Sequence, residues 1–206
     1  MKKESKRYEA VSTYYEEAAL GDDEIVVYKK FENITFDKEI RFYSFDNCLF
    51  INCTFKCNFF NTTFHNTKFS KCDFSNTIFD SCGIQKTIIE SSRMVGTNLI
   101  KSKLRRVDIV NSNLLMISLD ESELGECIFE NTKMCNSNMA SVIITDTTFI
   151  GVDLSESEFV TTPLNGIDLT DTIIDGISIV PEFLRGVIVT QVQAIEFINL
   201  FGIIVK

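Results

Sequence analysis

Large apolar residues recur at every fifth position of this chain from Phe59 to Ile179, without one break in register. If apolar residues held 45% of the positions at random, so long a run would arise less than about once in 10⁸. The period of five therefore predicts a repeat fold over more than half of the chain. We call these positions the centres of the repeat: Phe59, Phe64, Phe69, Phe74, Phe79, Ile84, Ile89, Met94, Leu99, Leu104, Ile109, Leu114, Leu119, Leu124, Phe129, Met134, Met139, Ile144, Phe149, Leu154, Phe159, Leu164, Leu169, Ile174 and Ile179.

A second register lies two residues before each centre and holds small or β-branched residues, such as Thr62, Cys72 and Ser92. Residues two apart in an extended strand point to the same face, so we expect both registers to face inward. Because five is odd, a straight strand would change faces at each repeat. The other two residues must therefore turn the chain, and Asn, Asp, Ser, Gly and Lys are common there, as turns require.

Upstream of this run, Phe45, Phe50 and Phe55 keep the period, but Phe55 and Phe59 are only four residues apart, which predicts a bulge or a tightened corner between them. Residues 5–20 carry apolar residues at helical spacing, and Gly21 follows them. We expect a helix there that caps the N-terminal end of the repeat, whose edge strand would otherwise be open.

The C-terminal residues depart from the repeat. Pro181 stops the pattern, residues 186–189 read as a last strand, and Thr190 with Gln193 forms a capping-box signature. A helix is expected from Gln191 to about Phe201 that is apolar nearly all round, so one side can cover the last coil and another needs a partner. We predict a homodimer, with these interface residues: Val192, Ile195, Phe197, Ile198 and Phe201.

The residues of a catalytic or metal site are scarce. His65 is the only histidine and follows a centre, so we expect it on the surface. Six cysteines (Cys48, Cys53, Cys57, Cys72, Cys82 and Cys127) fall in the small register and are expected to be buried, while Cys135 should face outward. We therefore expect no enzyme activity, metal, cofactor or small-molecule substrate. No signal peptide or membrane-spanning run is evident, which predicts a cytoplasmic protein.

Charge is the feature that bears most on function. The formal net charge of −9 disfavours direct binding to nucleic acid and favours a basic protein partner. The stretch from Lys86 to Arg106 is basic, whereas from residue 120 to 175 only Lys133 opposes the carboxylates. The predicted partner-facing acidic residues are Asp120, Glu121, Glu123, Glu126, Asp146, Asp153, Glu156, Glu158, Asp168, Asp171 and Asp175, with Glu130 in the same stretch.

The motif of a small residue, a polar residue, Leu or Phe, and two variable residues resembles the pentapeptide-repeat family. The resemblance implies four pentapeptides per coil and an all-β fold, a right-handed quadrilateral parallel β-helix. With coils of this size, the stretch from residue 120 to 175 would carry about one net negative charge per 1.3 Å of axis, close to the value of about 1.7 Å for duplex DNA. Three segments are expected: an N-terminal cap over residues 1–30, the β-helix over 31–180, and the C-terminal strand and dimerisation helix over 181–206.

Within that family, the acidic segment and the residues from Gly186 to Val205 resemble the Qnr and MfpA group, and above all its loopless, Gram-positive Qnr-like type. The resemblance implies a DNA mimic that binds DNA gyrase or topoisomerase IV, with quinolone resistance as the outcome. Pentapeptide repeats also occur in proteins without gyrase activity, so the alternative is an interaction scaffold or an immunity-type protein with another partner.

Overall fold

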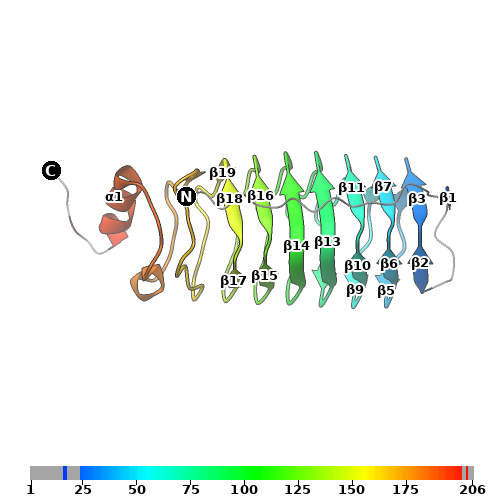
Figure 1. The fold of residues 1–206 in the computed structure, drawn as a ribbon, viewed down its shortest axis with the longest axis horizontal. Coiled ribbons are helices and arrows are strands. Elements are labelled where there is room, and N and C mark those ends of the chain that lie inside the picture. Colours follow the sequence, from blue (N-terminus) through cyan, green and yellow to red (C-terminus); the bar gives the residue numbers. More distant parts are fainter. Residues whose placement is uncertain (1–15, 18–23, 201–202, 204–206) are drawn as a thin grey trace.

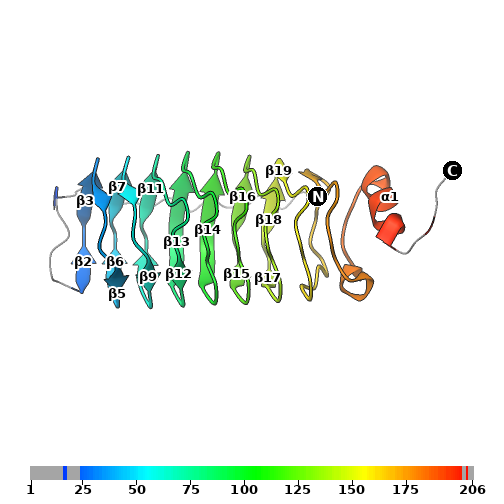
Figure 2. The ribbon, with the colours of Figure 1, turned by 180° about the vertical axis from the view of Figure 1, so that it is seen from behind.

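The computed structural model describes residues 16–17, 24–200 and 203. The chain winds into a rod of stacked coils, and the helix α1 lies at one end of the rod (Figures 1 and 2). All the strand pairs are parallel. Neighbouring coils are offset by 19 residues near the N-terminus and by 20 residues farther along. The predicted parallel β-helix is therefore confirmed.

Each coil has four sides, and we number them faces 1 to 4 in chain order. The face 1 strands are β2 Ile25–Val27, β6 Ser44–Asp46, β10 Thr63–His65, β15 Glu123–Gly125 and β17 Ile143–Thr145. The face 2 strands are β1 Glu16–Glu17, β3 Lys29–Glu32, β7 Leu49–Ile51, β11 Lys68–Ser70, β16 Ile128–Glu130 and β18 Thr148–Ile150. Two long strands run over both faces: β13 Gly83–Glu90 and β14 Lys103–Val110.

Faces 3 and 4 have shorter strands, which single parallel bridges such as Arg93 to Asn113 extend along the rod. The face 3 strands are β4 Thr35–Phe36, β8 Thr54–Phe55, β19 Val152–Asp153 and β20 Thr172–Ile173. The face 4 strands are β5 Ile40–Arg41, β9 Phe59–Phe60 and β12 Phe79–Asp80. Outside the strands lie the 3-10 helix η1 Pro181–Leu184 and the helix α1 Gln191–Leu200.

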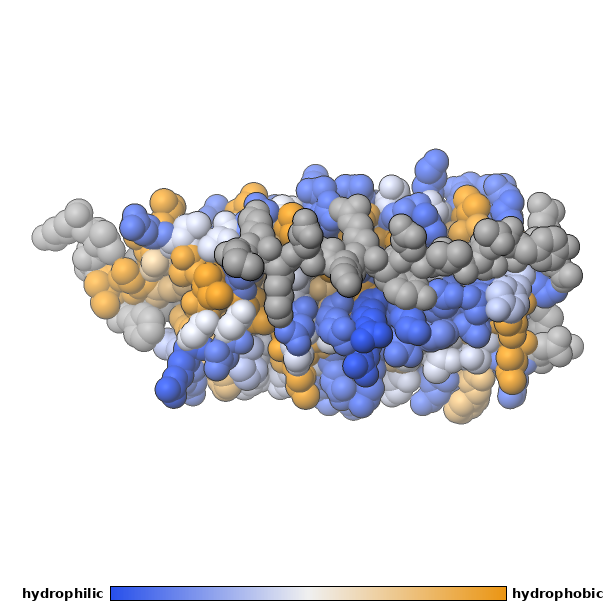
Figure 3. Space-filling view, in the orientation of Figure 1, coloured by the Kyte–Doolittle hydropathy of each residue, from blue (hydrophilic) through white to orange (hydrophobic). Residues whose placement is uncertain are grey.

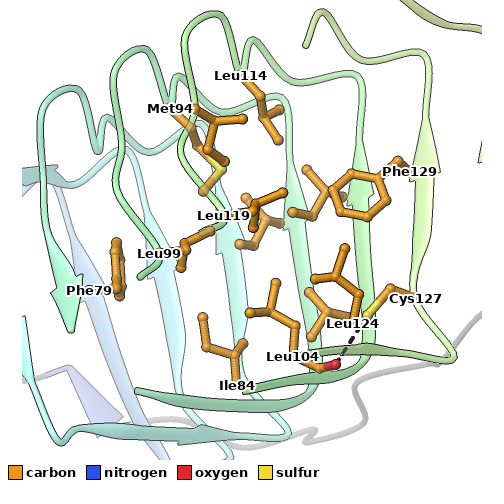
Figure 4. Packing of buried hydrophobic residues seen from close by; sticks show 14 of the residues in the cluster. Phe79, Ile84, Met94, Leu99, Leu104, Leu114, Leu119, Leu124, Cys127 and Phe129 are labelled. Carbon is orange, nitrogen blue, oxygen red and sulfur yellow. Dashed lines mark hydrogen bonds between the residues drawn. The ribbon is translucent and has the colours of Figure 1, made fainter. Parts of the chain in front are cut away.

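The centres form the core, because each one points into the rod and stacks on the centres of the coils next to it. In the N-terminal coils these are phenylalanines: Phe50 stacks on Phe31 and Phe69 with ring centroids 4.7 Å away in both cases. Farther along, Leu, Ile and Met take over, and Figure 4 shows residues such as Leu99, Leu119 and Leu124 pointing into the same interior. The core is thus one column of apolar side chains that runs along the rod.

The small register is buried with the centres, as predicted, and Cys48, Cys53, Cys57, Cys72, Cys82 and Cys127 all lie in the core. Many hydroxyl and thiol groups in this register donate to carbonyl oxygens of the coil before. Thr62 Oγ1 lies 3.3 Å from the Ile40 oxygen, and Cys127 Sγ lies 3.4 Å from the Leu104 oxygen (Figure 4). A buried polar group without such a partner would be costly, so the register is restricted to small donors and small apolar residues.

Most corners turn through a residue with positive φ two places after the centre, such as Asn61 at 48° and Asn66 at 50°. Asn and Gly are favoured there because other residues pay a steric cost in the left-handed region. The tightened corner predicted between Phe55 and Phe59 is confirmed, since Phe55 pairs with Phe36 while Phe59 pairs with Ile40. The same shortening therefore occurs at Phe36 to Ile40, and neither corner contains a residue with positive φ.

The N-terminal helix expected over residues 5–20 is wrong where the structure can test it, because Glu16–Glu17 form the strand β1. The backbone of this strand pairs in parallel with Lys29 and Lys30 of β3. Extension of the sheet by a charged strand satisfies the open backbone groups of β3, which a helix would leave unpaired. The rest of that expected helix lies outside the described residues.

At the other end, the capping box is confirmed. The Thr190 amide donates to Gln193 Oε1 at 2.9 Å, and the Gln193 amide donates to Thr190 Oγ1 at 3.2 Å. Gln193 Nε2 also donates to the carbonyl oxygens of Leu169 and Thr172, so it joins α1 to the last coil. The last strand expected at residues 186–189 is reduced to a single bridge between Ile188 and Asp168.

Candidate functional site: the acidic C-terminal coils

The predicted acidic residues lie on the outside of the coils, but they are spread around the rod. Glu123 lies on face 1, Asp168 on face 2, Asp153 on face 3 and Glu158 on face 4. The others lie at or near the corners: Asp120, Glu121, Glu126, Asp146, Glu156, Asp171 and Asp175. The structure therefore gathers these carboxylates at one end of the rod, and it does not align them on one face.

The basic stretch lies one coil below the first part of the acidic stretch and pairs with it. Lys103 Nζ is 2.8 Å from Glu123 Oε1, and Lys101 Nζ is 3.8 Å from Glu121 Oε2. Glu126 accepts hydrogen bonds from Arg106 and Arg105. These bonds, of which the one from Arg106 has the larger effect, hold the pKa of the Glu126 carboxyl below its usual range. Since these carboxylates are paired within the chain, the expectation that Lys133 alone opposes the acidic segment is wrong.

Three further carboxylates accept hydrogen bonds that stabilise the local backbone of the coils. Asp120 accepts hydrogen bonds from Ser118 Oγ, Asn138 Nδ2 and the Ala140 amide, at 3.1, 2.9 and 3.0 Å. Asp153 accepts from the amide and hydroxyl of Ser155, and Asp168 from those of Thr170. Replacement of these carboxylates would therefore also disturb the local backbone.

What remains is a stretch without any cationic residue, because no Lys, Arg or His occurs between Lys133 and Arg185. Within it Glu156, Glu158 and Asp175 lie close to the corner between faces 3 and 4, and we call these three residues the acidic edge. Glu156 and Asp175 belong to successive coils, since the Glu156 amide donates to the Asp175 oxygen at 2.8 Å. All three are exposed, and none forms an ion pair within the described residues.

Gly176 makes room for the acidic edge. Its φ of +70° lies in the left-handed region, and a Cβ on it would come within 2.6 Å of Glu156 Oε1. A side chain at position 176 would displace the Glu156 carboxylate, so the glycine serves both the turn and the position of this charge.

The predicted dimer residues on α1 divide into two groups. Val192 and Ile195 are 76% and 43% exposed, and Figure 3 shows hydrophobic surface gathered at this end of the rod. Phe197 is 6% exposed and belongs to the core cluster, so we leave it out of the proposed interface. Ile198 is half-buried, and Phe201 lies outside the described residues.

The other candidate groups show no catalytic arrangement. His65 is half-exposed on β10, where Nδ1 lies 2.8 Å from Asp46 Oδ1. Cys135 is only partly exposed, and burial, together with the neighbouring Asp153, raises the pKa of its thiol to about 11. Among the described residues, no cluster of His, Cys, Asp or Glu is suited to hold a metal ion, and no helix is long and apolar enough to cross a membrane.

Residues 57–94 match the family model described as pentapeptide repeats. No curated protein sequence matches the chain. A solved structure of trypsin-treated QnrB1, "a plasmid-mediated fluoroquinolone resistance protein", is 22% identical and has a TM-score of 0.48, with 88% of this chain and 99% of that chain covered. HetL from Nostoc sp. strain PCC 7120, a pentapeptide repeat protein "involved in Heterocyst Differentiation Regulation", is 12% identical with a TM-score of 0.32, with 80% and 86% covered.

The matched repeats and the structure agree. The family model covers two coils' worth of chain, and the same inward registers continue through every coil to Ile179, with no insertion between Phe59 and that residue. Residues 57–94 are therefore identified as pentapeptide repeats, and the fold continues their registers along the rod.

Proposed function

We propose that the protein acts without catalysis as a mimic of duplex DNA, and that its acidic C-terminal coils bind the DNA-binding surface of a type II topoisomerase, DNA gyrase or topoisomerase IV. The observation that supports this most is the stretch between Lys133 and Arg185, residues 134–184, which carries carboxylates on successive coils and no cationic residue. The proposal places the protein in the cytoplasm, where the chromosome and these enzymes meet.

Charge spacing supports the choice of partner. Successive coils lie about 4.8 Å apart along the axis, so each coil of this stretch adds two or more carboxylates over less than two base-pair steps of DNA. A basic groove that holds DNA phosphates would also attract these groups, and their fixed positions would cost little entropy on binding. Glu121, Glu123 and Glu126 form ion pairs within the chain and are therefore less available to a partner. For this reason we place the contact with the topoisomerase on the coils nearer the C-terminus.

A homodimer through α1 would double the length of the acidic surface, because the acidic edge lies in the coils next to that helix. Val192 and Ile195 present the apolar surface for this contact. The resemblance of the C-terminal residues to the dimerisation tail of Qnr-type proteins supports the same arrangement. A two-fold axis at α1 would then bring two acidic ends together at the middle of a long rod.

Substitution of both Val192 and Ile195 by Asp should therefore convert a dimer into monomers, because burial of four charges at a two-fold contact is strongly unfavourable. Light scattering at micromolar concentration measures the mass. The matched control is Ile143→Asp. Ile143 is an apolar residue of β17 that is 60% exposed and lies away from α1, so this variant should remain a dimer. A monomeric unmutated protein would show that α1 is not a dimer interface.

The functional test is a titration of DNA supercoiling by gyrase and of decatenation by topoisomerase IV, each with and without a quinolone. A DNA mimic should change the activity of at least one enzyme or reduce the drug-induced cleavage of DNA, at a stoichiometry near one rod per enzyme. If neither enzyme responds in any of these assays, the alternative role as a scaffold or immunity-type protein for another basic partner becomes the better account.

A further inference from the structure

Two buried cysteines stack on each other in consecutive coils of face 3. Thr54 and Asp73 form a parallel bridge, and the Asp73 amide donates to the Cys53 oxygen at 2.9 Å. Cys53 and Cys72 precede these two residues and both point into the core, where they are 1% and 2% exposed. Cys82 has no cysteine in the next coil, where its amide donates to Ser102 Oγ at 3.1 Å.

The geometry suits a covalent bond between the two sulfurs. Paired residues in adjacent strands have Cα atoms about 4.8 Å apart, which lies within the range of about 4.4–6.8 Å found for disulfides. Both thiols point the same way, since Cys53 Sγ lies 3.4 Å from the Phe31 oxygen and Cys72 Sγ lies 3.6 Å from the Phe50 oxygen. The mutual influence of the two thiols lowers the pKa of Cys53 and raises the pKa of Cys72, which favours Cys53 as the thiolate of the pair.

We propose that Cys53 and Cys72 are a redox pair that closes to a disulfide between consecutive coils when the protein meets a peroxide. The Cys53 thiolate attacks one peroxide oxygen, which gives a sulfenic acid and hydroxide. The Cys72 sulfur then attacks the sulfenic sulfur, and the hydroxyl leaves with the thiol proton as water. The two thiols lose two electrons and two protons, and one hydrogen peroxide becomes two water molecules. A small oxidant is required because both thiols are buried.

Hydrogen peroxide treatment of the folded protein, followed by thiol counting and peptide mapping, tests this pair. The unmutated protein should lose two of its seven thiols and yield one linked peptide that contains Cys53 and Cys72. The Cys53→Ser and Cys72→Ser variants should each keep all six of their remaining thiols. The Cys82→Ser variant should still lose two thiols. Serine fits this register, since Ser92 and Ser102 occupy it in the next coil, so the variants should fold.

Refolding in a glutathione redox buffer tests whether the Cys53–Cys72 disulfide is stable even if an oxidant cannot reach the two thiols in the folded protein. In the unfolded chain, loop closure favours cysteines close in sequence, such as Cys53 with Cys57, whereas the folded coils should select Cys53 with Cys72. Retention of all seven thiols under both conditions, or a linked peptide that joins any other pair, would overturn the proposal.

Discussion

Replacement of Phe50 by alanine should lower the free energy of unfolding by about 3–5 kcal/mol. Phe50 is fully buried, stacks on Phe31 and Phe69, and meets Phe36, Phe45 and Phe55 within its own and the neighbouring coils. Its removal would leave a cavity in the middle of the aromatic column. In a solenoid each coil is held only by its neighbours, so the stack cannot close the gap from elsewhere.

Phe42→Ala is the matched control, because Phe42 is 63% exposed at a corner and its loss should change stability by about 0.5 kcal/mol or less. Urea denaturation of the three proteins, with the midpoint and the slope both fitted, gives the comparison. Equal effects of the two substitutions would contradict the assignment of Phe50 to the interior.

Charge reversal of Glu156 and Glu158 to lysine should weaken topoisomerase binding by about 100-fold, if each reversal costs about 1.4 kcal/mol of binding free energy. These two residues are exposed on the acidic edge and hold no ion pair within the described part of the chain, so the fold should tolerate the change. Asp120 and Glu121 suit the test less well, because the first accepts three hydrogen bonds and the second pairs with Lys101.

Glu24→Lys with Asp37→Lys is the matched control, since it changes the net charge equally but in the first coil, far from the acidic edge. Calorimetric titration of each variant into gyrase at two salt concentrations gives the affinities, and thermal melting confirms that both variants fold. A similar loss of binding in both variants would mean that net charge alone, and not the C-terminal coils, governs the contact.

The repeat could be predicted because it is a property of sequence spacing alone. The centres, the buried cysteines, the capping box of α1 and the tightened corner at Phe55 all follow from residue types at spacings of two to five residues. The coil that begins at Val26 was not predicted. The shortened corner between Phe36 and Ile40 puts the centres of this coil that precede the corner out of register with Phe45 and the centres after it.

Neighbours across coils were harder to predict, since they lie 19 or 20 residues apart and the offset depends on each corner. For this reason the acidic stretch reads as unopposed in the sequence, although Lys103, Arg105 and Arg106 lie directly below its first carboxylates. The strand β1 could not be foreseen either, because the pairing of Glu16 and Glu17 with Lys29 and Lys30 decides its structure.

Competition with DNA is the most direct test of the mimicry. A fluorescently labelled DNA duplex bound to gyrase would be titrated with the protein, and fluorescence anisotropy would report the DNA that stays bound. The proposal predicts that the protein displaces the duplex completely, less effectively as salt rises, and that the variant with Glu156→Lys and Glu158→Lys fails to do so. A stable complex that contains gyrase, DNA and the protein together, or a duplex that stays bound throughout, would contradict it.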